Sequence, residues 1–279
     1  MTDVLGLHGR PGLVVGGGSG IGRATALLLA QAGADVAVAD VDAARAEEVC
    51  QEVQGYGVKA VTIQGDVTVA EEAVRVVDEA HAALGGLYAV INIVGLASWS
   101  QLLDLDLAMW ELDLRQNLTH HLHVGRAAAR HMIADGTQGS LALVASVSGL
   151  YGAPNHGAYG AAKAATMALA RTMADEWGPH GIRVNCVAPD IIATPRVVAG
   201  FAAQGLTDMQ APIAADGVPL ARWGRPEEIA GPLVFLVSGL AGFMTGQTLV
   251  VDGGTQARFP HGGAKPFGND AGSGGSSES

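Results

Sequence analysis

The chain is poor in cysteine and in positive charge. Its 279 residues include only Cys50 and Cys186, which have neither disulfide-scaffold nor metal-motif spacing, so we expect buried, inert thiols and a reducing, cytoplasmic location. Sixteen basic residues face 27 acidic ones, for a formal net charge of −11. Such a charge repels phosphate backbones and anionic membrane surfaces, so neither nucleic acid nor a membrane is an expected partner.

Neither an export signal nor a membrane span is expected from the sequence. The first twelve residues carry charged side chains and no apolar core of a signal peptide. Residues 229–251 are free of charge, but Pro232 and the glycines beyond it predict a helix, a turn and a strand instead of a span. Because no linker-like break interrupts the chain, we expect one domain over residues 1–260 and a flexible Gly/Ser-rich tail over 261–279.

The strongest chemical signal lies within residues 139–165. Their apolar run 141–145 predicts a buried strand that ends near Ser146. Beyond a loop rich in Gly, Pro and Asn, Tyr159 and Lys163 begin an alanine-rich helix, on which residues four apart share one face. We therefore expect these two side chains to point the same way.

A tyrosine beside a lysine can act as an acid or base. A free phenol has a pKa of about 10, and a neighbouring ammonium favours the phenolate; a fall of about three units corresponds to about 4 kcal/mol. Lys163 is expected to lower the pKa of Tyr159 in this way. Taken alone, the spacing is more typical of a packed ring beside a solvated charge.

Glycines near the amino end predict a phosphate-binding loop. Residues 13–15 predict a strand, residues 16–22 are Gly-Gly-Gly-Ser-Gly-Ile-Gly, and a helical run follows. Glycines let the backbone approach a pyrophosphate closely, and the helix start offers free N–H groups and a positive dipole end. Strand, loop and helix together give the context that a dinucleotide site requires, although a tight turn without a ligand has the same composition.

The next predicted strand ends in a carboxylate. Asp40 lies 18 residues beyond Gly22, where a ribose-binding acid is expected. A carboxylate accepts hydrogen bonds from both adenosine ribose hydroxyls and repels a 2′-phosphate, which favours NAD over NADP. The alternative is that Asp40 caps the following helix, a role that Asp42 fills equally well.

In this order and at these distances, the motifs resemble the short-chain dehydrogenase/reductase family over roughly residues 8–255. Further segments match the family's motifs. They are Asp66-Val67 at the adenine, Asn92 and Gly95 within residues 90–95, the helix asparagine Asn117, Ser146 thirteen residues before Tyr159, and residues 184–194, 224–230 and 251–254.

Four departures from the family pattern bear on the cofactor pocket. Val15 lacks the hydroxyl that usually ties the glycine loop to neighbouring backbone, and Ile93 and Val94 put bulkier groups beside the adenosine half. Asp190 replaces a glycine near the nicotinamide and adds a charge.

The resemblance implies an NAD(H)-dependent oxidoreductase that interconverts a secondary alcohol and a ketone, with Asn117, Ser146, Tyr159 and Lys163 as catalytic residues. It also implies a homotetramer. An apolar, medium-sized substrate is expected from the apolar residues of a lid over about 190–221. The implied cofactor contacts, with no metal, are Gly16, Gly18, Ser19, Gly20, Ile21, Gly22, Asp40, Val41, Asp66, Val67, Asn92, Gly95, Tyr159, Lys163, Pro189, Ile192 and Thr194.

Two other functions are open. An NADPH-dependent 3-oxoacyl thioester reductase is disfavoured, because Ser19 and Val41 stand where such enzymes carry basic residues. A non-catalytic binding protein that senses the cofactor is disfavoured by the four intact catalytic positions.

The alternation of apolar and helical segments predicts an α/β fold. We expect a single-domain, Rossmann-type, doubly wound parallel sheet of about seven strands with helices on both faces and ligands at the strands' carboxyl ends. The expected strands are 12–16, 35–40, 58–65, 87–92, 140–146, 182–188 and 247–251, and the expected helices are 20–32, 42–54, 69–84, 105–134, 157–178 and 226–238.

Histidines in the middle of the chain do not predict a metal site. Neighbouring helical residues diverge by about 100°, and His120, His121 and His123 have no carboxylate at ligand spacing, so we expect them, with His131, to line a helix face or a subunit contact. His156 would cap a helix or reach substrate, and the cap is favoured.

Overall fold

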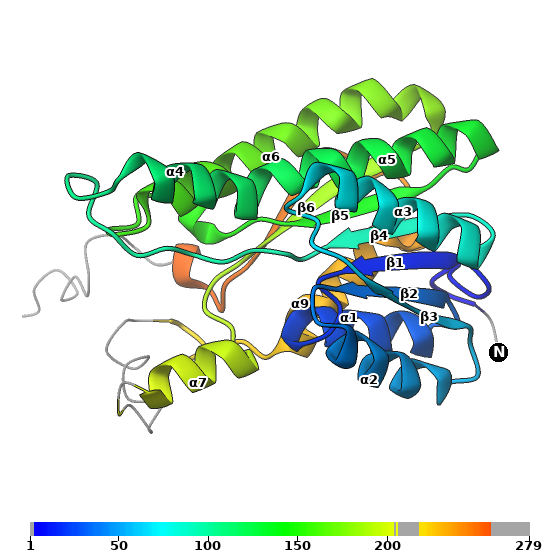
Figure 1. Ribbon diagram of the computed structural model, residues 1–279, viewed down its shortest axis with the longest axis horizontal. Helices are drawn as coiled ribbons and strands as arrows, with labels where there is room; N and C mark the ends of the chain where they lie inside the picture. Colours follow the sequence, from blue (N-terminus) through cyan, green and yellow to red (C-terminus); the bar gives the residue numbers. More distant parts are fainter. Residues whose placement is uncertain (1–2, 204, 206–217, 258–279) are drawn as a thin grey trace, which may run out of the picture.

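A seven-stranded parallel sheet forms the middle layer of the structure (Figure 1). The computed structural model describes residues 3–203, 205 and 218–257. The expected tail, and residues 204 and 206–217 of the expected lid, lie outside them. The strand order is β3-β2-β1-β4-β5-β6-β7, formed by β1 (Pro11–Val15), β2 (Asp35–Asp40), β3 (Ala60–Gln64), β4 (Ala89–Asn92), β5 (Ser140–Val144), β6 (Arg183–Pro189) and β7 (Thr248–Val251).

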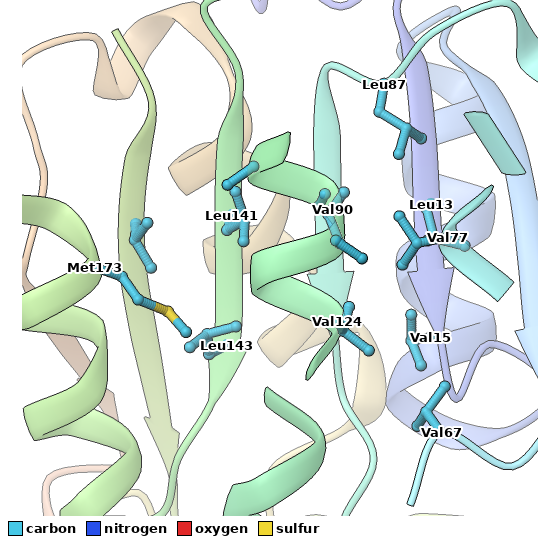
Figure 2. Close-up of a cluster of buried hydrophobic side chains, with 14 of the residues drawn as sticks. Leu13, Val15, Val67, Val77, Leu87, Val90, Val124, Leu141, Leu143 and Met173 are labelled. Atoms are coloured by element: carbon cyan, nitrogen blue, oxygen red, sulfur yellow. The ribbon is translucent and has the colours of Figure 1, made fainter. Parts of the chain in front are cut away.

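Helices cover both faces of this sheet, as the sequence predicts (Figure 1). On one face lie α3 (Ala70–Leu84), α5 (His120–Asp135) and α6 (Gly157–Trp177), and on the other α1 (Gly20–Gln31), α2 (Ala43–Gln54) and α9 (Pro226–Val237). The central strands β1, β4 and β5 are largely apolar because both of their faces are buried. Figure 2 shows the hydrophobic core between the sheet and helices α3, α5 and α6. In it, Leu13, Val90, Leu141 and Leu143 of the strands meet Val77, Val124 and Met173 of the helices.

The predicted helix 105–134 is interrupted. It comprises α4 (Leu107–Leu114), a π-helical turn (Arg115–Thr119) and α5. One further helix, α7 (Pro195–Ala203), lies in the expected lid and was not predicted as a helix. Such π turns often occur at functional sites, and this one contains Asn117.

The apolar segment 229–251 forms the expected helix, turn and strand, namely most of α9, a short 3-10 turn (Gly239–Ala241) and β7. No helix in the described part of the chain combines the length and the apolar character that a membrane crossing needs. Cys50 and Cys186 are both free and buried, as expected.

Candidate active site

The predicted site residues meet at one edge of the sheet. Asp40 ends β2, Asn92 ends β4, Pro189 ends β6, and Ser146 follows β5 by two residues. Because all the strands run parallel, their carboxyl ends lie side by side, and this is the edge where such sheets bind ligands.

The glycine loop connects β1 to α1 and tolerates no side chain at its closest contacts. Gly16 and Gly20 adopt φ angles of +81° and +53°. A Cβ on Gly22 would lie 1.9 Å from the carbonyl oxygen of Gly16, and one on Gly18 would lie 2.8 Å from a carboxylate oxygen of Asp40. The loop backbone is therefore free to approach a ligand at the amino end of α1, where anions bind favourably.

Asp40 is nearly buried and points at this loop. It is 8% exposed, and its Oδ2 accepts a hydrogen bond of 3.0 Å from the Gly18 N–H. Asp42 is the residue that caps α2, since its side chain accepts from the N–H groups of Ala44 and Arg45. The alternative in which Asp40 serves as this helix cap is therefore wrong.

The remaining predicted cofactor residues surround the loop at different depths. Thr194 lies over it, because a Cβ on Gly20 would be 3.2 Å from the Thr194 methyl group. A Cβ on Gly16 would lie 3.1 Å from a methyl group of Val94, so this departure from the family pattern contacts the loop directly. Ser19 precedes α1 without a side-chain cap, and Ile21 is half-buried.

The acidic end of β3 is more open. Asp66 is exposed and accepts hydrogen bonds from the N–H and the hydroxyl of Thr68, while Val67 is buried in the core. The side chain of Val41 is exposed as well. Ile192 is buried beyond β6 and pairs with Gly224 in an isolated bridge.

Lys163 and Asn117 both lie against Gly95. A Cβ on Gly95 would be 3.1 Å from Lys163 Nζ and 2.9 Å from Asn117 Oδ1. Lys163 is 2% exposed and donates a hydrogen bond of 2.8 Å to the carbonyl of Val144. The Asn117 side chain is fixed by Leu96, donating to its carbonyl at 2.8 Å and accepting from its N–H at 2.9 Å.

Ser146 and Tyr159 are neighbours in this site. Ser146 is 8% exposed and accepts from the Ser148 N–H at 3.2 Å. Burial raises the pKa of Tyr159, although the hydroxyl of Ser146 lowers it, and Asp113 adds a smaller upward shift. Lys163 Nζ lies 5.6 Å from the centre of the Tyr159 ring.

The predicted lowering of the pKa of Tyr159 is therefore wrong for the protein alone. Two buried groups share the site, and desolvation disfavours the charged form of each. The same burial lowers the pKa of Lys163 to about 8.

Asp113 escaped the sequence analysis, and His156 was expected only as a cap or a substrate contact. Asp113 is 1% exposed and precedes Asn117 by one helical turn, a spacing that could have indicated it. His156 occupies the N-cap position of α6, as the favoured interpretation expects, although its side chain makes no capping hydrogen bond. Its ring instead packs between Trp99, at 3.9 Å, and Tyr159, at 5.3 Å between ring centres.

The neighbouring histidines of α5 lie inside the molecule. His120 and His121 are fully buried, with ring centres 4.1 Å apart, so they line the buried face of α5 and the alternative of a subunit contact is wrong for both. Nδ1 of His120 is 3.0 Å from the side-chain amide nitrogen of Asn92. Burial lowers the pKa of His120 to about 3. Among the described residues, no group of three or more side chains is arranged to hold a metal ion.

The geometry defines an α/β protein with a glycine loop and a Ser-Tyr-Lys constellation at one edge of its sheet. The family model described as "Enoyl-(Acyl carrier protein) reductase" matches residues 15–256. The cis-4-hydroxycyclohexanecarboxylate dehydrogenase of Sinomonas cyclohexanicum is 39% identical over 249 residues, which cover 89% of this chain and 97% of that protein. The cyclohexanol dehydrogenase of Rhodococcus sp. strain TK6 is 37% identical over 91% of this chain and 98% of its own length.

Solved structures agree with the sequence matches. A short-chain type dehydrogenase/reductase from Mycobacterium marinum aligns with a TM-score of 0.85 and 35% identity, covering 92% of this chain and 99% of its own. The chain belongs to the short-chain dehydrogenase/reductase family, whose dehydrogenases use nicotinamide cofactors.

Proposed function

We propose that the protein is an NAD-dependent oxidoreductase that interconverts a secondary alcohol and a ketone on an apolar, medium-sized ring. The observation that carries this proposal is the placement of Ser146, Tyr159 and the buried Lys163 at the strand edge that also holds the glycine loop. The names of two relatives point to ring alcohols, which supports the substrate class.

A dinucleotide fits the described residues. The closest contacts of Gly18 and Gly22 leave no room for a Cβ, and the Asp40 carboxylate lies beside the loop as a ribose acceptor. When bound, the nicotinamide supplies the centre that accepts or gives a hydride. Pro189, Ile192 and Thr194, with Asn92 and Gly95, are the remaining contacts proposed for it.

The chain's own residues manage the proton. Ser146 donates a hydrogen bond to the substrate oxygen, and Tyr159 takes the hydroxyl proton during oxidation or returns it during reduction. Lys163 holds positive charge near the phenol. Asn117, with its side chain fixed by Leu96, anchors the path by which the proton reaches solvent.

Asp40 supports NAD over NADP, because its carboxylate would face a 2′-phosphate as a like charge. The same argument stands against the NADPH-dependent 3-oxoacyl thioester reductase. The intact Ser146, Tyr159 and Lys163 stand against a non-catalytic sensor. We further propose that residues 1–260 form one catalytic unit with a substrate lid over about 190–221, and that the protein acts as a cytoplasmic homotetramer.

A cofactor-linked screen of secondary alcohols tests this function. Purified protein should reduce NAD with cyclohexanol or 4-hydroxycyclohexanecarboxylate, and Tyr159→Phe should bind NAD almost as well while losing turnover. Lys163→Ala should impair both. Retention of a tenth of kcat in Tyr159→Phe would end the assignment of Tyr159 as the acid and base.

A further inference from the structure

A carboxylate without a partner lies where β6 leaves the sheet. Asp190 directly follows Pro189, the last residue of β6, and its side chain is half-buried. Within the described part of the chain, this carboxylate takes part in no ion pair and accepts no hydrogen bond. A carboxylate in contact with water is charged near pH 7 and acts only as an acceptor.

The segment that Asp190 begins joins the catalytic end of the sheet to the glycine loop. β6 pairs with β5, and beyond the last paired residues the Ala145 N–H still donates to the Val187 carbonyl at 2.8 Å. Ser146 and Asp190 therefore continue from neighbouring strands at the same edge. At the other end of the segment, Thr194 lies over the glycine loop. Asp190 is thus at the Ser146 end of a stretch whose far end contacts the loop.

Asp190 also lines a cavity at the carboxyl ends of β6 and β7. Ile192, Val218 and Leu220 line the same cavity, and all three belong to the proposed substrate lid. The carboxylate is therefore set among apolar side chains, on the side of the site that the lid covers. A ring substrate held under this lid has Asp190 in its surroundings.

No positive charge in the cavity lining is free to neutralise Asp190. Among the described residues that line it, the one basic side chain is Arg222, and its two Nη atoms donate to the Glu228 carboxylate at 2.7 and 2.6 Å. Asp252 adds a further carboxylate from the end of β7, and its oxygens accept two backbone N–H groups. The cavity therefore carries an excess of negative charge.

The phenol of Tyr151 agrees with this placement. Tyr151 is 44% exposed and belongs to the loop that joins Ser146 to Tyr159. Burial raises its pKa, and the negative charges of Asp190 and Asp252 raise it further.

We propose that Asp190 determines specificity by charge: its carboxylate repels a ring alcohol with an anionic substituent and favours one with an ammonium group. This inference rests on the proposed function and narrows its substrate class. Like charges repel more strongly in a cleft that excludes water than in bulk solvent, and opposite charges attract more strongly there. The charge of the substituent, besides the apolar ring, then decides which alcohols are oxidised well.

Three ring alcohols that differ in one substituent test this selection. They are 4-(aminomethyl)cyclohexanol, 4-(hydroxymethyl)cyclohexanol and 4-hydroxycyclohexanecarboxylate, which near pH 7 are cationic, neutral and anionic. In the parent protein, kcat/KM for NAD-linked oxidation should fall in this order, by about tenfold at each step.

Asp190→Asn removes the charge with little change in shape. Relative to the neutral alcohol, it should raise kcat/KM for the carboxylate and lower it for the amine, by about tenfold each. The matched control is Glu227→Gln, which removes an exposed carboxylate of α9 that does not line the cavity and should leave both ratios unchanged. Equal changes for all three alcohols in Asp190→Asn would place its effect on the cofactor or the fold, and would overturn the inference.

Calorimetric titration with two analogues that lack the reacting hydroxyl gives a readout without turnover. In the presence of NADH, (aminomethyl)cyclohexane should bind at least about tenfold more tightly than cyclohexanecarboxylate, and Asp190→Asn should remove this difference. If no alcohol is oxidised yet the difference is found, the proposed function fails and the charge selection stands. Oxidation of all three alcohols with equal kcat/KM would overturn the inference alone. Neither turnover nor a difference in binding would overturn both.

Discussion

The guanidinium of Arg45 lies 3.0 Å from the Asp40 carboxylate, on Oδ1, which also accepts the Asp42 N–H. Oδ2 faces the glycine loop through Gly18. Arg45, a cation beside the expected ribose acceptor, is therefore already held by that acid. This arrangement bears on which cofactor the protein prefers, because freeing Arg45 would supply the charge that a 2′-phosphate needs.

We expect the enzyme to favour NAD over NADP by roughly thirtyfold to a thousandfold in kcat/KM, which is about 2 to 4 kcal/mol. Asp40→Ala should shrink this ratio by weakening NAD and by releasing Arg45. Adding Arg45→Ala to the Asp40→Ala variant should lower kcat/KM with NADP again. The measurement is initial rates with both cofactors at subsaturating concentration.

The control for Asp40 is Asp106→Ala, which removes a carboxylate that caps α4 and, unlike Asp42, does not pair with Arg45. It should cost about 1 kcal/mol of stability and leave the cofactor ratio unchanged. Equal efficiencies of NAD and NADP in the parent protein would show that Arg45 already serves the phosphate.

Lys163→Met should raise stability while it abolishes activity. Burial lowers the pKa of Lys163 to about 8, below its ordinary value of 10.5, so below pH 8 the fold carries the full cost of the buried charge. Between pH 8 and 10.5 the folded lysine is neutral while the unfolded one is still charged, and this cost shrinks. At pH 7 the free energy of unfolding of Lys163→Met should exceed that of the parent by up to about 3 kcal/mol.

Denaturant unfolding of the parent and Lys163→Met proteins at pH 7 and pH 10 measures this difference. The exposed Lys59 provides the control, since Lys59→Met should give no gain that depends on pH. A Lys163→Met protein less stable than the parent at pH 7 would mean that the hydrogen bond to Val144 outweighs the desolvation.

His120 should make the protein sensitive to acid. Burial lowers its pKa to about 3 from 6.5, so the unfolded chain binds a proton that the folded one refuses, and stability falls as pH drops from 6.5 towards 3. In His120→Gln, the loss of unfolding free energy between pH 6.5 and 3 should be smaller than in the parent, by at most about 5 kcal/mol. The exposed His180 is the control, and His180→Gln should leave the curve unchanged. Parallel curves for His120→Gln and the parent would contradict the prediction.

Apolar ring alcohols should exceed small polyols in kcat/KM by at least about tenfold, since burying a few CH₂ groups contributes more than 1.4 kcal/mol. Trp99 is 70% exposed and lies against His156, whose ring packs on Tyr159. Trp99→Ser should reduce the preference for the apolar ring. The fully exposed Phe243 is the control, and Phe243→Ser should leave it unchanged. Polyols that outperform cyclohexanol would reject this substrate class.

Local patterns made most of the fold and the candidate site predictable. Strands buried on both faces are apolar runs, the glycine loop follows from its own steric limits, and Tyr159 and Lys163 share a face because they are four residues apart on one helix. The parallel order then brings Asp40 and Ser146 to one edge. Each of these inferences depends on neighbours in sequence or on a general rule of sheet topology.

The sequence by itself determined the α/β architecture, the glycine loop and the identity of the Ser-Tyr-Lys residues. Only the tertiary structure decided the π turn at Asn117, the contact of Arg45 with Asp40, the burial of Asp113 and the raised pKa of Tyr159. The physical reason is that desolvation and charge–charge distance depend on which elements pack together, and no spacing along the chain encodes them.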